Sequence, residues 1–262
     1  TDLLDDAHAA QHTGTVALGI RHVLCTPLNT IEYGGAAGSE RRIGVLYMDS
    51  RERGYLQHVG ALHALAAEAA IVIENARLYR EVVERERTAQ ELRIAAQIQQ
   101  ALLPPGHHEG PLAELAAVTT PCRAVGGDFF DYVAHDAGRL TFALGDVAGK
   151  GTSAALLTAV VQGLFAAEAE TDDSPSLVLA RVNKSLCRRA VESRFVTAFY
   201  GLIDAHHVLH YCNAGHNPPF LLSSRGVERL EIGGTVLGLF GVSTFDNGEV
   251  PFAPGDMLVL FS

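Results

Sequence analysis

The sequence predicts an α+β protein in which one long helix joins a small N-terminal segment to a larger C-terminal domain. Residues 61–103 contain neither proline nor glycine and consist mainly of good helix formers. Short strand-like runs recur between residues 195 and 261, and two helical patterns precede them. Helices set apart from many short strands are typical of the α+β class. The 262 residues suffice for one large domain or two modest ones.

Two strand-like runs dominate the N-terminal segment. Residues 21–28 and 42–49 are rich in apolar and β-branched side chains. Residues 32–40 between them are rich in glycine and other small residues, which is typical of a hairpin loop. We therefore expect a β-hairpin ahead of the long helix.

The long helical pattern would extend about 65 Å, which is more than one compact domain covers. Its apolar residues recur at spacings of three and four, as in a coiled-coil seam. The seam fails across residues 84–90 and resumes in a shifted phase, which locally alters supercoiling. One interpretation is a rigid spacer, and the other is a parallel homodimer whose helix register changes with the state of a sensor. The seam residues are Leu62, Leu65, Ala69, Val72, Ala76, Tyr79 and Val83, then Leu92, Ala95, Ile98 and Leu102.

The C-terminal part, residues 106–262, follows the helix-ending Pro104 and Pro105. Residues 112–122 predict a loop that leads into a strand. Residues 151–168 are apolar nearly all round, which predicts a buried helix, and a second helix is expected to begin at Pro175. Further strands are predicted near residues 195–203, 207–212, 218–222, 227–231, 248–252 and 256–261.

Composition restricts the partners of the chain. Lys and Arg number 20 against 30 Asp and Glu, giving a net charge of -10, so we expect no nucleic-acid partner. No run is apolar for about 18 residues, so we expect no membrane span. Four scattered cysteines without CxxC spacing argue against a zinc site and favour a reducing, cytoplasmic location.

Two aspartates lie in glycine-rich turns around a short apolar run. Asp128 begins one strand-like segment and Asp146 ends the next, with turn residues 135–139 between the segments. Antiparallel pairing would place the two carboxylates side by side, where they repel by roughly 4 kcal/mol at an effective dielectric constant of about 20. Either they share a proton or a cation lies between them, and hard oxygen ligands suit Mg²⁺ or Mn²⁺. Each aspartate alone would be explained as well by capping its own turn. Asp131 falls on the opposite face from Asp128.

Five blocks of sequence, in order, resemble the PP2C-type metal-dependent protein phosphatases, specifically the bacterial SpoIIE and RsbU-like branch. The resemblance covers about residues 95–262. It implies an α-β-β-α sandwich, with two packed antiparallel sheets flanked by helices. The blocks are Val125-Gly-Gly-Asp-Phe-Phe-Asp131, Gly145-Asp-Val-Ala-Gly-Lys-Gly151, Phe195-Val-Thr-Ala-Phe-Tyr200, Asn213-Ala-Gly-His-Asn-Pro-Pro219 and Pro254-Gly-Asp-Met-Leu-Val-Leu-Phe261.

The N-terminal segment is similar to the closing half of a GAF domain. The similarity rests on residues 23–28, residues 44–49 and the helix that ends at residues 69–77. It implies a sensor segment that binds a small ligand. The predicted organisation is therefore a partial GAF-like α/β segment over residues 1–60, a coiled-coil linker over residues 61–105 and a PP2C/SpoIIE-like domain over residues 106–262.

The resemblance also implies roles for single residues. Asp146 would bridge two ions, Mn²⁺ or Mg²⁺, while Asp128 holds one of them and the carbonyl of Val147 completes the set. Arg123 and Lys150 are candidates to grip the substrate phosphate, although each is explained as well by a solvated loop. The residues expected to line or support the site are Gly127, Gly149, Asn213, Gly215 and His216.

The function implied is that of a protein serine/threonine phosphatase that hydrolyses phosphoserine on a STAS-type anti-sigma factor antagonist, under control of the sensor through the linker. Two alternatives stay open: a non-catalytic sensor and scaffold with a phosphatase-like domain, and a metal-free hydrolase that uses the carboxylate pair on sugars. In the family, the last strand runs into metal-binding aspartates that lie beyond Ser262. We therefore expect weak or absent activity in this stretch alone and activity in the parent chain.

Overall fold

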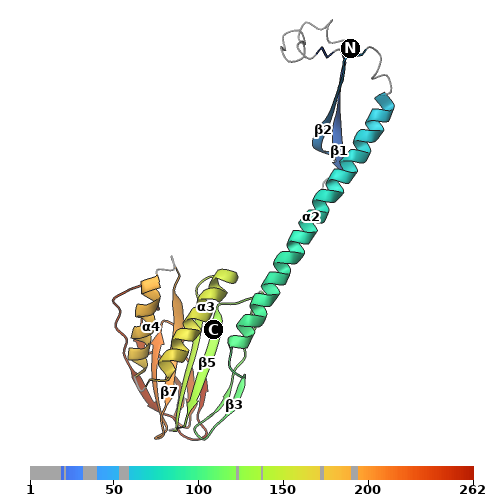
Figure 1. The fold of residues 1–262 in the computed structure, drawn as a ribbon. Coiled ribbons are helices and arrows are strands. Elements are labelled where there is room, and N and C mark those ends of the chain that lie inside the picture. The colour runs from blue at the N-terminus through green and yellow to red at the C-terminus, as the bar shows by residue number, and fades with distance from the viewer. Residues whose placement is uncertain are drawn as a thin grey trace. The chain divides into compact units, whose positions relative to one another are not determined.

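A computed structural model describes residues 19–20, 22–31, 40–52, 59–121, 124–136, 138–171, 174–189 and 194–262. The chain divides into two compact units, Thr1–Thr88 and Ala89–Ser262, and the division falls inside the long helix. Figure 1 shows the elements of each unit.

The N-terminal unit contains the predicted pair of strands. β1 (His22–Ile31) pairs antiparallel with β2 (Glu40–Ser50), with Cys25 opposite Tyr47. Most of the predicted hairpin loop, residues 32–39, lies outside the described residues.

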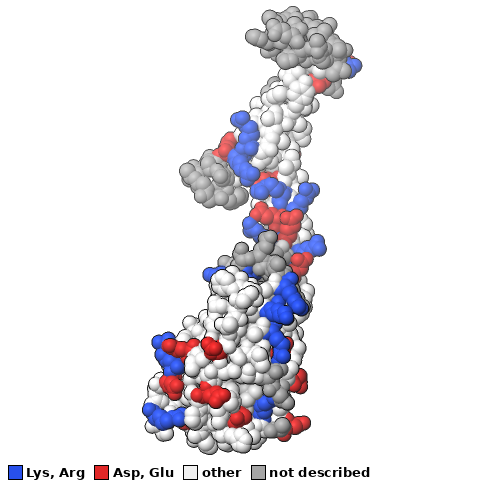
Figure 2. Space-filling view, turned by 90° about the vertical axis from the view of Figure 1, so that its left-hand side faces the viewer, with Lys and Arg blue, Asp and Glu red and all other residues white. Residues whose placement is uncertain are grey.

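The long helix is confirmed as α2 (Val59–Leu102), which ends just before the paired prolines. Ion pairs support one side of it: Glu74 and Glu81 both contact Arg77, and Glu81 also contacts Arg85. Such pairs at spacings of three and four residues stabilise an exposed helix modestly. Figure 2 shows acidic and basic side chains intermixed along this helix.

A six-stranded sheet forms the centre of the C-terminal unit. Its strands follow the order β11-β8-β7-β6-β5, and β12 also pairs with β8. Most neighbours are antiparallel, as the sequence predicts, whereas β11 is a short parallel addition that the sequence did not indicate. The strands are β5 (Asp128–His135), β6 (Arg139–Val147), β7 (Val196–Ile203), β8 (Val208–Ala214), β11 (Gly233–Gly234) and β12 (Gly248–Pro251).

A second sheet packs against one face of the first. It has the order β10-β9-β13 and consists of β9 (Phe220–Ser223), β10 (Gly226–Arg229) and β13 (Met257–Val259). The two sheets bury a shared apolar cluster that includes Phe142, Phe199 and Leu221. Phe199 lies between Phe142 and Tyr211, with ring centroids 6.3 and 5.5 Å away.

Two helices cover the other face of the central sheet. They are α3 (Thr152–Ala169) and α4 (Pro175–Arg189), close to the predicted positions. A second core cluster joins Leu157 and Phe165 of α3 and Val178 of α4 to Phe129 on the sheet. In Figure 1 both helices run along the sheet that contains β5 and β7. The described residues therefore form three layers of the expected α-β-β-α sandwich, and the fourth, a helical layer on the second sheet, is not among them.

Helix α3 is buried on one side only, which corrects the prediction of a buried helix over residues 151–168. By length and composition it is apolar enough to cross a membrane, and it is the one such helix in the described part of the chain. Its side toward the sheet buries Ala154, Leu157, Val161 and Phe165. Packing in the core explains this side of the helix, whereas Leu156 and Val160 on the opposite side are 72% and 39% exposed.

The stretch predicted as a loop contains a small hairpin instead. β3 (His107–Glu109) pairs with β4 (Glu114–Ala116), so the loop prediction over residues 112–122 is wrong at its start. Strands of three residues are too short for alternation to reveal them in a sequence.

Candidate metal centre

The β5–β6 hairpin sets Asp128 directly opposite Asp146. The predicted turn is confirmed, because the register runs from this pair to His135 opposite Arg139. Directly opposed residues have Cβ atoms about 4.5–5.5 Å apart, so the two carboxylates share one end of the hairpin. Burial first, and the charge of Asp128 second, raise the pKa of Asp146. This shift has the direction expected for a carboxylate beside a like charge.

The pair and Asp131 lie on opposite faces of the sheet, as alternation predicted. Residues alternate between faces along a strand, which places Asp146 on the side of Phe142 and the second sheet. Asp131 lines a small cleft with Phe165 and Ala169 of α3. Burial there raises the pKa of Asp131, and the backbone N–H of Tyr132 partly opposes the shift. Asp131 therefore belongs to the helix side of the sheet.

Gly127 shapes the space beside the aspartate pair. A Cβ atom at this position would lie 2.5 Å from the Val147 carbonyl oxygen and 2.8 Å from Oδ1 of Asp146. Both oxygens therefore approach the Gly127 backbone more closely than a side chain at this position would allow. The Gly127 carbonyl accepts bonds from the Val147 N–H at 3.2 Å and from the Thr158 hydroxyl at 3.0 Å, which fixes this turn. Carboxylate and carbonyl oxygens around one space fit a hard divalent ion.

Arg194 holds the loop that follows β6. Its guanidinium donates to the Ala148 carbonyl at 3.1 Å and to the Ser153 hydroxyl at 2.8 Å. Gly149 has φ 119 and leaves the space that the Arg194 side chain fills. Lys150 is exposed in the same loop. Arg194 was not among the predicted residues, because nothing near it in the sequence indicates a contact with a loop 46 residues away.

His216 follows β8 and contacts β7, the strand that pairs with β6. Thr197 of β7 is opposite Asp146, and the Thr197 hydroxyl hydrogen-bonds Nδ1 of His216 at 2.9 Å. The Asn213 side chain bonds both the N–H and the carbonyl of His216, at 2.7 and 3.1 Å. Gly215 has φ 65 and makes this tight turn. The structure thus connects Asn213, Gly215 and His216 to the aspartate pair through Thr197, a residue to which the sequence analysis gave no role.

The His216 ring is buried, with 5% of its surface exposed. Burial lowers its pKa, and the Phe261 backbone and the charge of Asp128 oppose the shift. Its Nε2 lacks a hydrogen-bond partner of standard geometry. The residues after β13 reach the aspartate pair, because the Ser262 hydroxyl donates a hydrogen bond to Oδ1 of Asp128 at 2.7 Å.

The predicted site residues are therefore largely brought together. Gly127, Asp128, Asp146 and Val147 form one cluster at the end of the β5–β6 hairpin. Arg123 lies outside the described residues. The roles in binding metal or phosphate stay predictions.

A further residue from the linker helix reaches this cluster. Gln99 of α2 donates to the Gly126 carbonyl at 2.8 Å and accepts from the Gly126 N–H at 3.1 Å. This contact was not predicted, because a glutamine in a helical sequence gives no signal of a partner 27 residues away.

Comparisons with known proteins agree with this fold. Residues 136–262 match the family model described as Stage II sporulation protein E (SpoIIE). The phosphoserine phosphatase RsbU of Bacillus subtilis (strain 168) is 32% identical over 175 residues, covering 66% of this chain and 52% of RsbU. The phosphoserine phosphatase RsbP of the same strain is 29% identical over 142 residues, covering 52% of this chain and 35% of RsbP. The chain thus spans about half the length of RsbU and about a third of RsbP.

A solved structure shows the same architecture. The SiaA-PP2C domain of Pseudomonas aeruginosa superposes with a TM-score of 0.57 at 22% sequence identity, covering 67% of this chain and 71% of that domain. The sandwich around the aspartate pair, the family match and the likeness to RsbU lead to one conclusion: the chain carries a SpoIIE/PP2C-family domain, homologous to the RsbU and SpoIIE phosphatases.

Proposed function

We propose that this domain is a metal-dependent protein serine/threonine phosphatase that removes phosphate from phosphoserine. The observation that carries the proposal is the register of Asp128 against Asp146 beside Gly127, whose backbone the Val147 carbonyl and Oδ1 of Asp146 approach closely. Two relatives of the chain are named phosphoserine phosphatases. Because the chain spans only part of their length, the activity is proposed for the whole protein.

The candidate ligands are oxygen donors suited to Mn²⁺ or Mg²⁺. Asp146 would contact two ions, Asp128 would hold one of them, and the Val147 carbonyl would complete the set. Bound divalent ions supply charge neutralisation for the phosphate dianion and acidify a water molecule. The chain itself supplies fixed geometry, since Thr158 and the Val147 N–H hold the Gly127 turn in place. Lys150 is exposed in the loop that follows Val147 and is proposed to attract the phosphate.

The proposed substrate is a phosphorylated STAS-domain protein of the anti-sigma factor antagonist type, acting in the cytoplasm. The likeness to the phosphoserine phosphatase RsbU supports this proposal. The GAF-like segment is proposed to sense a small ligand and to control the phosphatase through α2. The direct contact of Gln99 with Gly126, next to Gly127 and Asp128, supports this route of control.

The decisive experiment measures phosphate release by the full-length protein from a phosphorylated STAS-domain protein and from p-nitrophenyl phosphate. We expect activity with Mn²⁺, loss of activity with EDTA and recovery on adding Mn²⁺. Asp146→Asn should lower kcat/KM at least about a hundredfold, because it removes a charge that holds the ions. Asp136→Asn is the matched control, since Asp136 is exposed in the turn at the other end of the hairpin.

The outcomes separate the remaining alternatives. A rate of phosphate release that is unchanged by EDTA and by Asp146→Asn would contradict the metal-dependent mechanism. It would favour carboxylate chemistry without metal. A folded full-length protein that releases no phosphate from either substrate would favour the scaffold.

A further inference from the structure

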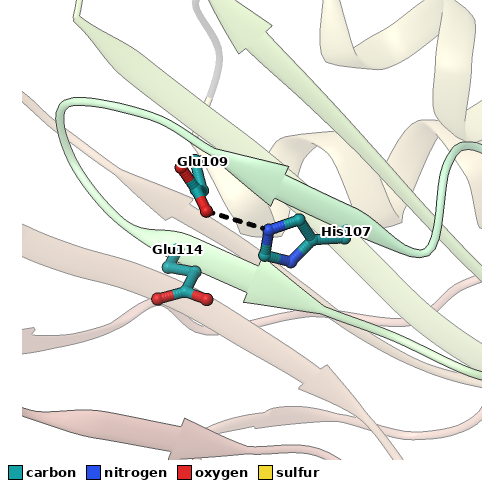
Figure 3. Close-up of side chains that lie close together, drawn as sticks. All are labelled: His107, Glu109 and Glu114. Carbon is teal, nitrogen blue, oxygen red and sulfur yellow. Dashed lines mark hydrogen bonds and ion pairs between the residues drawn. The ribbon is translucent and has the colours of Figure 1, made fainter.

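The outer face of the β3–β4 hairpin gathers three potential metal ligands away from the aspartate pair. His107 and Glu109 lie on β3 and Glu114 lies on β4, all exposed. One ligand atom from each lies within 4.8 Å of the other two. Figure 3 shows the His107 ring and the Glu109 carboxylate turned toward each other, with Glu114 across from them on the neighbouring strand.

Strand register places these side chains together. Glu109 is directly opposite Glu114, and His107 is two residues from Glu109 and therefore on the same face. Backbone bonds close both ends of the hairpin, from the Gly110 N–H to the Ala113 carbonyl at 3.2 Å and from the Ala117 N–H to the Gly106 carbonyl at 2.8 Å. The three donors thus project from a backbone that is already fixed.

The inner face of the hairpin anchors it to the domain. The His108 ring lies 5.3 Å from the Tyr132 ring, and Leu112 packs on the core between the sheets. The Tyr132 hydroxyl donates to the Pro105 carbonyl at 3.0 Å, directly after the end of α2. Since His108 faces inward, His107 faces outward as a consequence of alternation rather than of chance side-chain rotation.

The charges on the outer face lack a basic residue nearby in the sequence. Two glutamates directly opposite each other in a β-ladder destabilise the pair. Residues 104–121 contain no Lys or Arg. Nε2 of His107 lies 3.2 Å from Oε1 of Glu109. Within this group of three side chains, His107 is thus paired with Glu109 and not with Glu114. A divalent cation among them would neutralise both carboxylates.

The ligand set indicates the class of ion. One imidazole nitrogen and two carboxylate oxygens suit borderline transition ions, whose affinity for such sites rises toward nickel and copper. Calcium prefers six to eight oxygen ligands, and magnesium rarely takes an imidazole. We propose that His107, Glu109 and Glu114 bind one divalent transition ion of the Zn²⁺, Co²⁺ or Ni²⁺ class, with water in the open positions. Such an ion links β3 to β4 at the junction between α2 and the phosphatase-like domain.

The test is isothermal titration of the purified chain with NiCl₂ in an Asp146→Asn background, which suppresses binding at the aspartate pair. We expect one strong site. His107→Ala and the isosteric Glu114→Gln should each weaken Ni²⁺ binding at least about tenfold, because each removes a ligand. His206→Ala is the matched control, since His206 is also exposed but lies in the turn before β8. It should leave the affinity unchanged.

A second readout identifies the location independently of affinity. Paramagnetic Ni²⁺ should broaden the NMR signals of His107 and of its strand neighbours at the lowest ratio of ion to protein. The proposal is overturned if His107→Ala and Glu114→Gln bind Ni²⁺ as tightly as the parent, or if the first broadened signals belong to another histidine. Because the fold of each variant is monitored by the same spectra, an unfolded variant cannot be mistaken for a lost ligand.

Discussion

The absence of a side chain at Gly127 allows two candidate ligand oxygens to approach its backbone closely. Its importance does not come from a positive φ, because it is absent from the glycines with that conformation. It comes from close approach, since a Cβ atom there would lie 2.5 Å from a backbone oxygen and 2.8 Å from Asp146. Backbone atoms cannot rotate away as the end of a flexible side chain can. The glycine is thus required by the neighbouring oxygens.

We expect Gly127→Ala to weaken Mn²⁺ activation of the full-length protein at least about tenfold, with a loss of roughly 1–3 kcal/mol in unfolding free energy from overpacking. Gly163→Ala is the control, because Gly163 lies inside α3 with nothing within 4 Å of the added Cβ. That substitution should stabilise the helix by about 0.5–1 kcal/mol. Mn²⁺ titration of phosphate release and denaturant unfolding measure both effects. An unchanged Mn²⁺ dependence in Gly127→Ala would refute the role assigned to this close approach.

At the scale of elements, the end of α2 is joined to the turn that begins β5. The Gln99 side chain makes two hydrogen bonds with the backbone of Gly126, just as a neighbouring strand would. Gly126 is adjacent to Gly127, so a rotation or shift of the last turns of α2 would move the candidate ligand cluster. This contact gives the proposed sensor control a direct physical route.

We expect Gln99→Leu to lower phosphatase activity more than it lowers stability. The two lost bonds should cost on the order of 1–3 kcal/mol of unfolding free energy, which a folded domain tolerates. Gln97→Leu is the control, since Gln97 is exposed on the same helix. The measurements are phosphate release at saturating Mn²⁺ and denaturant unfolding. Full activity in Gln99→Leu, with only the stability reduced, would mean that the contact serves structure alone.

At the scale of the whole molecule, the apolar seam of α2 points to a second copy of the chain. Val72, Tyr79 and Val83 are 66%, 71% and 47% exposed. The ion pairs of Glu74, Arg77 and Glu81 occupy other positions around the helix, so the seam itself stays apolar. We propose that the exposed part of the seam, residues 72–83, packs against a second copy of the chain as in a parallel homodimer.

We expect the chain to sediment as a dimer at micromolar concentration. Val72→Asp combined with Tyr79→Asp should raise the dimer Kd at least about a hundredfold, because unpaired charges are costly to bury in a coiled-coil seam. Arg85→Ala, on the ion-paired side, should leave the Kd nearly unchanged. Analytical ultracentrifugation across a concentration series measures both. A monomeric parent chain would rule out the seam as a dimer interface.

The sequence alone determined the features that depend on local patterns. The absence of glycine and proline over residues 61–103 predicted α2, and the turn at residues 135–139 fixed the register that pairs Asp128 with Asp146. Alternation then placed Asp131 on the other face. These inferences succeeded because helix formation, turn geometry and the two-residue strand period all act within a few residues.

Only the tertiary structure decided which distant residues meet at the aspartate pair. Thr197 comes opposite Asp146 through the pairing of β6 with β7, and Arg194 and Gln99 reach backbone atoms far from them in sequence. The sequence did not predict the β3–β4 hairpin for a related reason. Its strands have three residues each, and packing of Leu112 and Ala113 on the core anchors them. Contacts of this kind depend on the closing of long loops and on side-chain packing, and neither leaves a periodic trace in the amino-acid sequence.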